Sequence, residues 1–480
     1  MISFVIPVYN PNIEVFKKCI KSLISQSLKD WEAVIVLDGP NEAVKGIIGG
    51  FADKRLSTLE IAHGGAQRAR NEGFKHIKGK YVCFWDCDCV IEPEAAKNWV
   101  DIFKSEPDKA FIYSGYKFLD EKGAINAEPF DPWLLKCGNY ISTCFPMRKE
   151  VFPGFDESLK SLQDWDLWLT IVENGGVGRF VDGYAFSTLY PTEKSISGQN
   201  CKEDVWLERV DAVKTKHNLP DRKVCVSSLS YKQEGIRLAK LIDADYKDVP
   251  NYKPNRYDTI IQVGFSLHPN MVTSHSAIFN QKLSKKIIFF TMADVTEVNN
   301  FVSLKAISLY AELLNCQAIM FVEDIAAKKI MERAGFKVSV MPLPIVNTDN
   351  IEPLPTEARV VVDITPEYRQ VIGCIEHSLP DIKLEPLTGN KAIKDYSAIL
   401  ALNPEKTMTF EMKRMLLAGR NVISNVESPF CGKVDDNDSM GKFISSLVET
   451  IRKRVLRNTA PAVNFWAKEH QPTKLLEVLK

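Results

Sequence analysis

Two aspartates separated by a single residue form the most informative chemical pattern of the sequence. Asp86 and Asp88 follow the apolar run 81–85, which predicts a buried strand. Because side chains at positions i and i+2 of a strand point the same way, both carboxylates are expected to converge where the strand ends. Paired carboxylate oxygens at an open site suit Mg²⁺ or Mn²⁺ bound together with a diphosphate. The structural alternative is an ordinary solvated turn.

The residues before this pair predict the elements that would position it. A β-branched and aromatic run at 2–10 indicates a buried strand, and apolar side chains at helical spacing between 13 and 28 indicate a helix. Residues 31–37 indicate a second strand. Strand, helix and strand in this order form the βαβ unit of a parallel sheet, whose ligands bind beyond the carboxyl ends of the strands. That edge would gather Tyr9, Asn10, Asp38, Asp86 and Asp88.

Six segments follow one another in an informative order. They are residues 5–10 (Val-Ile-Pro-Val-Tyr-Asn), 37–39 (Leu-Asp-Gly), 65–73 (Gly-Ala-Gln-Arg-Ala-Arg-Asn-Glu-Gly), 86–88 (Asp-Cys-Asp), 154–157 (Gly-Phe-Asp-Glu) and 164–168 (Asp-Trp-Asp-Leu-Trp). This ordered set resembles family 2 of the glycosyltransferases, which have the nucleotide-binding GT-A fold. The resemblance covers the N-terminal part of the chain and implies an α/β domain that binds a nucleotide sugar.

The resemblance implies roles for the residues at the strand ends. The nucleoside is expected to bind at Pro7, Tyr9, Asn10 and Asp38. Asp86 is expected to contact the ribose or the sugar of the donor, and the Asp-x-Asp pair to hold a divalent metal ion on the diphosphate.

Arg70 and Asn71 lie in a segment, 67–74, that predicts a helix beside the sheet. A basic residue facing the diphosphate would stabilise its negative charge, so both residues are candidate donor contacts. The structural alternative is that Arg70 is a surface charge of that helix. The glycines at 64 and 65 predict the tight turn before it.

The carboxylate of Asp164 is the candidate catalytic base. Transfer from a nucleotide sugar requires neutralisation of the leaving diphosphate, which a metal ion provides. It also requires removal of a proton from the attacking hydroxyl, which a positioned carboxylate provides. The resemblance assigns this second role to Asp164. The structural alternative is an N-cap of a helix over 167–172, because aspartate is favoured at that position.

The sequence departs from the family after the catalytic segment. Family members often carry an arginine and a histidine there, and the histidine completes the metal shell, whereas residues 190–197 contain no histidine. Glu193 is the candidate replacement, as an oxygen ligand beside Asp86 and Asp88. The Gln-x-x-Arg-Trp signature of processive synthases is also missing, which favours the transfer of a single sugar.

The composition is that of a globular protein with balanced charge. Of 480 residues, 45% are hydrophobic and 25% are charged, and the formal net charge of +0 provides no overall basic field for nucleic acid or anionic membrane. No apolar run approaches ~20 residues, so no membrane span is predicted. The 11 cysteines, without a signal peptide, indicate reduced thiols and a cytoplasmic location. Cys83, Cys87 and Cys89 are expected to be buried thiols rather than zinc ligands.

The second part of the chain predicts a doubly wound α/β arrangement. We expect a GT-A domain at 1–217, a linker at 218–256, and two Rossmann-like halves at 257–350 and 351–480. Helical patterns separate many of the strand-like runs at 259–263, 286–290, 318–322, 337–341, 359–363 and 398–402.

This part resembles the GT-B class of glycosyltransferases through residues 318–323, 334–345 and 411–424. It departs from that class at Arg414, where a glutamate is usual, while Glu411 lies one turn earlier. We therefore consider two roles for this part of the chain. It is either a non-catalytic domain for acceptor binding or assembly, or a second transferase.

The sequence thus predicts a metal-dependent, inverting glycosyltransferase that moves a sugar from a nucleotide sugar, preferably uridine-linked, to an acceptor hydroxyl. A bacterial or phage glycan, or its lipid-linked precursor, is the expected acceptor. A modified DNA base is an alternative, because residues 452–457 are locally basic, although such a run also suits a solvated helix face. A non-catalytic sugar-nucleotide-binding scaffold is a further alternative, and the sequence does not specify an oligomeric state.

Overall fold

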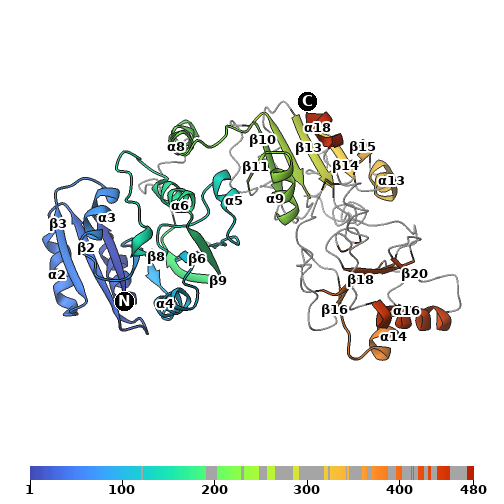
Figure 1. The fold of residues 1–480 in the computed structure, drawn as a ribbon, viewed down its shortest axis with the longest axis horizontal. Helices are drawn as coiled ribbons and strands as arrows, with labels where there is room; N and C mark the ends of the chain where they lie inside the picture. Colours follow the sequence, from blue (N-terminus) through green and yellow to red (C-terminus); the bar gives the residue numbers. More distant parts are fainter. Residues whose placement is uncertain are drawn as a thin grey trace. The chain divides into compact units, whose positions relative to one another are not determined.

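The structure is a computed structural model, shown in Figure 1. The chain forms two compact units, Met1–Asp221 and Arg222–Lys480. The structure describes residues 1–119, 123–190, 203–228, 232–247, 257–264, 285–290, 318–322, 325–333, 335–341, 343–344, 359–364, 370–386, 396–402, 412, 415, 420–425, 431–433, 440–454 and 473–479.

The N-terminal unit is built on one mixed sheet. Its strands are β1 (Ile2–Val8), β2 (Trp31–Asp38), β3 (Leu56–Ile61), β4 (Tyr81–Phe84), β5 (Val90–Ile91), β6 (Lys109–Phe118), β7 (Ala124–Ile125), β8 (Pro146–Arg148) and β9 (Val177–Thr188). Its helices are α1 (Ile13–Ile24), α2 (Glu42–Phe51), α3 (Ala66–Phe74), α4 (Ala95–Ser105), α5 (Pro132–Cys137), α6 (Gln163–Glu173) and α8 (Glu203–Lys216), with the 3-10 turn η1 (Lys149–Val151). The strand order is β3-β2-β1-β4-β8-β6-β9-β5, and β7 pairs with β6.

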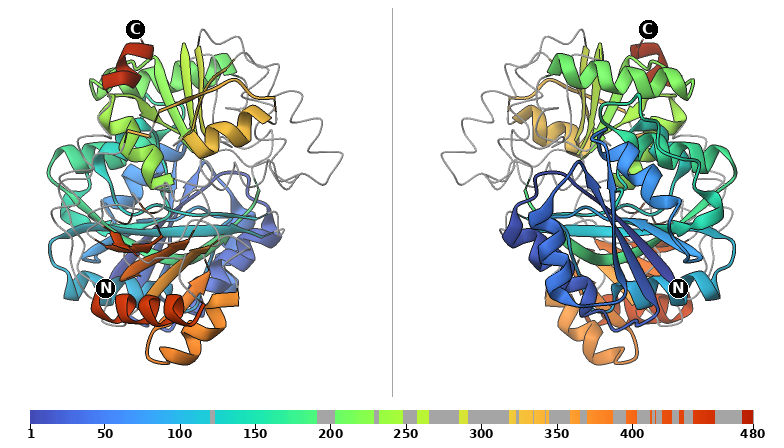
Figure 2. Two further views of the ribbon diagram at one scale, coloured as in Figure 1. Left: turned by 90° about the vertical axis from the view of Figure 1, so that its right-hand side faces the viewer. Right: turned by 90° about the vertical axis from the view of Figure 1, so that its left-hand side faces the viewer.

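The predicted βαβ unit opens this sheet. Strand β1 pairs in parallel with β2 on one side and with β4 on the other (Figure 2, where the N-terminal strands are dark blue). Helix α1 begins after Asn12, whose side-chain oxygen accepts hydrogen bonds from the backbone N–H groups of Glu14 and Val15. The helix ends at Ile24, earlier than the predicted end at residue 28.

Helix α3 packs closely on β1 and β2 through Gly73. A methyl group at Gly73 would lie 2.5 Å from Cγ1 of Val5 and 2.7 Å from Cγ2 of Val36. Only a residue without a side chain lets the helix approach the sheet this closely. The backbone of α3 is thereby fixed beside the strand ends that carry the predicted site.

The second unit contains two sheets in which all the observed pairs are parallel. The first consists of β10 (Val224–Ser228), β11 (Asp245–Tyr246), β12 (Thr259–Val263), β13 (Lys285–Phe290), β14 (Ile319–Val322) and β15 (Val338–Val340), in the order β11-β10-β12-β13-β14-β15. The second consists of β16 (Arg359–Ile364), β17 (Lys383–Pro386), β18 (Ala398–Leu402), β19 (Asn421–Ser424) and β20 (Cys431–Lys433), in the order β17-β16-β18-β19-β20. The helices among the described residues of this unit are α9 (Lys232–Leu241), α13 (Ile325–Arg333), α14 (Gln370–Ser378), α16 (Met440–Arg454) and α18 (Thr473–Leu479).

The predicted linker at 218–256 is wrong. Strands β10 and β11 lie within it, and β10 pairs in parallel with β12 along its whole length. A short strand directly after the polar stretch 218–223 is hard to recognise, because its apolar run covers only a few residues. The first sheet of the second unit therefore begins well before residue 257.

Some predicted features fall outside the described residues. These include Glu411, Arg414 and residues 455–457 of the basic run. Within the part of the chain that the structure describes, no helix combines the length and the apolar character needed to cross a bilayer.

Gly73→Ala should lower the free energy of unfolding by about 1–3 kcal/mol, because the added methyl group overlaps the two valines of the sheet. Gly46→Ala in α2 is the matched control, since nothing lies within 4 Å of the added carbon. It should raise stability by up to about 1 kcal/mol through helix propensity alone. Urea unfolding of the full chain followed by tryptophan fluorescence checks both changes, and equal effects of the two substitutions would contradict the packing argument.

Candidate active site

The carboxyl ends of β1, β2 and β4 lie side by side, because β1 pairs in parallel with both neighbours. Tyr9 and Asn10 directly follow β1, Asp38 ends β2, and Asp86 follows β4. Asn10 adopts a φ of 44°, a left-handed conformation that turns the chain away from the strand. Pro7 is half-buried within β1. The structure thus places these residues at the edge where the sequence predicted them.

Asp38 anchors the loop that follows β3. Its carboxylate is buried and accepts hydrogen bonds from the backbone N–H groups of Gly64 at 2.7 Å and Gly65 at 2.9 Å. The Nδ1 atom of His63 lies 2.9 Å from the same carboxylate. Gly65 has a φ of 94°, which favours glycine at this turn. The carboxylate of Asp38, the predicted nucleoside contact, is therefore already hydrogen-bonded to groups of the loop that follows β3.

His63 covers Tyr9 at this edge, a contact that the sequence analysis did not anticipate. The two rings stack with their centroids 4.3 Å apart and their planes 20° from parallel. Both side chains remain more than half exposed. The sequence feature that could have indicated this contact is the position of His63 directly before the predicted glycine turn.

Arg70 is the buried cation of the site. Its Nη2 atom donates a hydrogen bond to Oδ1 of Asp86 at 2.7 Å, and its guanidinium lies 5.4 Å from the ring centroid of Phe155. The side chain of Arg70 is only 5% exposed, so the alternative of a surface charge is wrong. Among the described residues, its Nε and Nη1 atoms have no hydrogen-bond partner. A buried guanidinium places a positive charge beside the strand ends, which suits an anionic ligand such as a diphosphate.

Asp88 adds a second carboxyl group to this strand end. Burial, followed by the negative charge of Asp86, raises the pKa of Asp88 to about 6. The charge of Asp86 thus disfavours the ionised form of Asp88, and a hard divalent cation at this strand end would stabilise both groups as carboxylates. The oxygen atoms of Asp86 and Asp88 therefore fit Mg²⁺ or Mn²⁺. Glu193, the predicted further ligand, lies outside the described residues.

Two thiols lie behind Asp86. The Sγ atoms of Cys89 and Cys144 are 3.7 Å apart, and the backbone N–H of Asp86 donates to Sγ of Cys144 at 3.4 Å. One ligand atom from each of these three residues lies within 4.8 Å of the others. Burial raises the pKa of both thiols, which keeps them protonated and unsuited to a hard cation. Cys83 is a buried free thiol, as expected, whereas Cys87 is half-buried.

Asn71 holds the loop that precedes α6. Its Nδ2 atom donates to the carbonyl oxygen of Phe155 at 2.9 Å and to the carboxylate of Glu157 at 3.0 Å. Its Oδ1 atom accepts from the backbone N–H of Phe155 at 2.8 Å. One turn earlier on α3, Nε2 of Gln67 donates to the carbonyl oxygen of Leu159 at 2.7 Å. Asn71, predicted as a donor contact, thus has both ends of its amide engaged with this loop.

Asp164 lies inside the first turn of α6, so its interpretation as an N-cap is wrong. The N-cap is Leu162, and the helix begins directly after it, earlier than predicted. Burial raises the pKa of Asp164 to about 6, while the charge of Arg70 lowers it and that of Asp86 raises it. Its Oδ1 atom accepts from the backbone N–H of Trp165 at 2.9 Å. A carboxyl group with a pKa near neutrality is suited to receive a proton from a hydroxyl.

An ionic cluster around the buried side chains of Asp166 and His217 holds α6 against the end of α8. The carboxylate of Asp166 accepts from Nε2 of His217 at 2.8 Å and lies 2.8 Å from Nζ of Lys216. The other ring nitrogen of His217 lies 2.8 Å from Glu173, and Lys216 also contacts Asp156 at 2.7 Å. Burial lowers the pKa of His217, but the hydrogen bonds with the two carboxylates outweigh it, and the net shift is upward. The sequence analysis did not anticipate this cluster, because its members are far apart along the chain.

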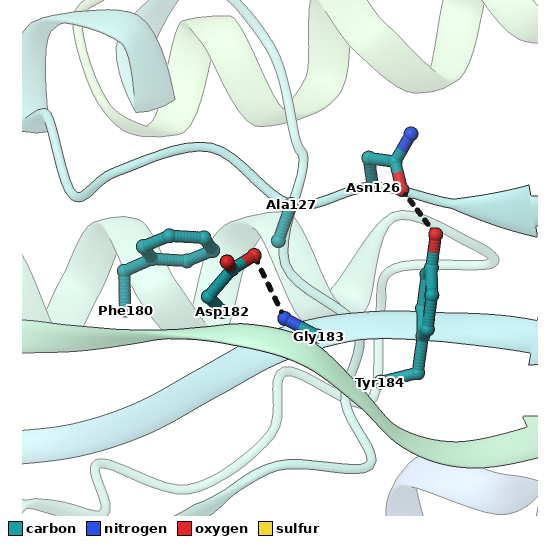
Figure 3. A pocket seen from close by; sticks show the side chains of 6 residues that line it. All are labelled: Asn126, Ala127, Phe180, Asp182, Gly183 and Tyr184. Atoms are coloured by element: carbon teal, nitrogen blue, oxygen red, sulfur yellow. Dashed lines mark hydrogen bonds between the residues drawn. The ribbon is translucent and has the colours of Figure 1, made fainter. Parts of the chain in front are cut away.

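A separate cavity lies beside the middle of β9 (Figure 3). Its volume is about 160 Å³, and it is lined by Asn126, Ala127, Phe180, Asp182, Gly183 and Tyr184. The hydroxyl of Tyr184 donates to Oδ1 of Asn126 at 2.7 Å. None of the predicted site residues lines this cavity, so it is distinct from the strand-end site.

Comparison with known proteins shows that the N-terminal unit is similar to glycosyltransferases. Residues 3–154 match the family model described as glycosyl transferase family 2. An uncharacterized glycosyltransferase of Rickettsia prowazekii is 30% identical over 185 residues, which cover 35% of this chain and 57% of that protein. An uncharacterized glycosyltransferase of Methanocaldococcus jannaschii is 27% identical over 190 residues, covering 36% of this chain and 65% of that protein. The O-antigen biosynthesis protein RfbC of Myxococcus xanthus is 29% identical over 184 residues, covering 36% of this chain and 14% of that protein.

The predicted resemblance to glycosyltransferase family 2 is confirmed over residues 3–154. The matched region spans less than two thirds of each of these relatives. A crystal structure of Staphylococcus aureus TarS 1–349 with UDP-GlcNAc matches with a TM-score of 0.39 and 18% identity, over 45% of this chain and 66% of that one. The predicted GT-B-like character of the C-terminal part is not confirmed and stays a prediction.

The stability that His217 contributes should decrease at alkaline pH. Because its folded-state pKa is raised, this contribution is fully present below the unfolded-state pKa of about 6.5 and is lost as pH rises through the folded-state pKa. His217→Gln should remove this pH-dependent part and destabilise the fold by about 1–3 kcal/mol, because Asp166 loses a buried donor. Thermal unfolding between pH 6 and 9, followed by the tryptophan fluorescence of α6, measures both effects. The exposed control His76→Gln should behave like the wild type, and a His217→Gln variant with an unchanged pH profile would refute the assignment.

Proposed function

We propose that the N-terminal unit transfers a sugar from a nucleotide sugar to an acceptor hydroxyl, in a metal-dependent reaction that inverts the transferred carbon. The observation that carries this proposal is the grouping of three carboxyl groups with one buried guanidinium. Arg70 binds Asp86, both charges act on Asp164, and Asp88 shares the strand end with Asp86. The match to glycosyl transferase family 2 over residues 3–154 supports the same class of reaction.

The donor would bind across the ends of β1, β2 and β4. Pro7, Tyr9, Asn10 and Asp38 would hold a uridine. The positive charge of the Arg70 guanidinium would then act on the negative charge of the diphosphate. The uracil base and the charge of the diphosphate would thus be recognised at neighbouring strand ends.

The oxygen atoms of Asp86 and Asp88 would hold Mg²⁺ or Mn²⁺. Such a cation acts as a Lewis acid that neutralises charge on the diphosphate leaving group. Arg70 orients Asp86 through its hydrogen bond, and the backbone N–H of Asp86 is fixed by Cys144. These contacts limit the movement of the first carboxylate before any ligand arrives.

Asp164 would act as the general base. Its ionised carboxylate would accept the proton of the acceptor hydroxyl while the hydroxyl oxygen attacks the sugar carbon and the bond to the diphosphate breaks. A single displacement of this kind inverts the configuration of that carbon. Asn71 and Gln67 position the loop that leads into α6, so they would hold the base without touching the reacting atoms.

A surface glycan or its lipid-linked precursor is the acceptor that we favour. The printed name of the matched Myxococcus xanthus protein, O-antigen biosynthesis protein RfbC, supports this class, although the match covers only 14% of that protein. The role of the C-terminal sheets in holding such an acceptor is likewise a proposal.

Asp88→Asn should abolish the Mn²⁺-dependent part of nucleotide binding while leaving the fold intact, because an amide is a weaker ligand for a hard cation. Calorimetric titration of the full chain with UDP, with and without Mn²⁺, measures this effect. Asp182→Asn, an exposed carboxylate on β9, is the matched control and should bind as the wild type does. Unchanged metal-dependent affinity in Asp88→Asn would exclude Asp88 as the principal ligand.

Asp164→Asn should leave donor binding intact and reduce turnover of the nucleotide sugar by about 10²–10⁴-fold, because only the general base is lost. At saturating Mn²⁺, which would keep Asp88 ionised, the wild-type rate should fall as pH decreases through about 6, where Asp164 becomes protonated, and the variant should lack this acidic limb. A screen of UDP-sugars for transfer or slow hydrolysis with Mn²⁺ provides the assay. A variant that binds donor and turns it over at nearly the wild-type rate would show that the base lies elsewhere.

A further inference from the structure

The stack of Tyr9 and His63 is unusual because both rings are exposed. Tyr9 is 58% exposed and the side chain of His63 is 57% exposed, so little hydrophobic burial holds them together. Two contacts keep the imidazole in place: the ring stack at 4.3 Å and the 2.9 Å contact between Nδ1 and Asp38. The imidazole therefore combines a planar aromatic face with a polar edge directed at a carboxylate.

Access to Asp38 depends on this imidazole. The side chain of Asp38 is only 3% exposed, and its remaining partners are the backbone N–H groups of Gly64 and Gly65. Those two groups belong to the turn that starts α3, so displacing them would disturb the helix. The side chain of His63 can instead rotate into solvent without moving the backbone. His63 is thus the one partner of Asp38 that an incoming ligand can replace at small cost.

We infer that His63 is a built-in occupant of the base site, which the pyrimidine ring of a nucleoside diphosphate displaces on binding. The pyrimidine would repeat both contacts of the imidazole, by stacking on Tyr9 and by donating an N–H hydrogen bond to Asp38. This inference rests on the proposed function. It makes the side chain of His63 a competitor of the nucleotide for one site, and we call this competition the gate. The apparent affinity for the nucleotide is then reduced in proportion to the time that His63 spends on Tyr9.

Calorimetric titration of the full chain with UDP and Mn²⁺ tests the gate. His63→Ala removes both contacts of the competing ring and should bind UDP about two- to tenfold more tightly than the wild type. His63→Phe retains the stack but loses the contact with Asp38, and should give an intermediate affinity. His76→Ala, which removes another exposed histidine, is the control and should leave the affinity unchanged.

A double variant separates the gate from other effects of the substitution. In a Tyr9→Ala background, where the stacking partner is missing, His63→Ala should give a smaller gain than in the wild type. Equal or weaker UDP binding by His63→Ala would overturn the gate alone, and weaker binding would instead make His63 a contact of the bound base. Absence of UDP binding in the wild type and in every variant would overturn the uridine-linked donor together with the gate.

Discussion

The buried guanidinium of Arg70 is the charge on which the candidate site depends. A buried ion is stable only when it is paired, and Arg70 is paired with the carboxylate that opens the Asp-x-Asp segment. The position of this charge is fixed by backbone packing, because Gly73 lets α3 lie directly against Val5 and Val36. The electrostatics of the strand ends therefore follow from the fit between one helix and the sheet.

Helix α3 also links the two sides of the site. Arg70 and Asn71 lie three and four residues after Gln67, so each of them lies beside Gln67 on the helix surface. The middle residue binds the strand-end carboxylate, while the outer two hold the loop that leads to α6. The start of the same helix is held through its turn by Asp38. A helix of nine residues thus connects the positions proposed for the nucleoside, the diphosphate and the general base.

Local patterns allowed much of the fold and part of the site to be predicted. The strands and their terminal aspartates were recognised because apolar runs and turn residues are adjacent in the sequence. Contacts between distant segments were not, as with Cys144 behind Asp86 or His217 beside Asp166, because no short pattern encodes them. The strand β10 was missed for a different reason: its apolar run is short and follows a polar stretch.

The position at which α6 begins determines in which direction the side chain of Asp164 points. Leu162, which precedes the helix, adopts a φ of 59°, a left-handed conformation that is unfavourable for leucine, and no side-chain hydrogen bond caps the helix there. Its starting point is therefore imposed by tertiary contacts rather than by local preference. Each residue of an α-helix advances the direction of its side chain by about 100°. A single residue inserted between Leu162 and Asp164 would consequently swing the carboxylate through more than a quarter of a turn, so this junction should tolerate substitutions far better than changes in length.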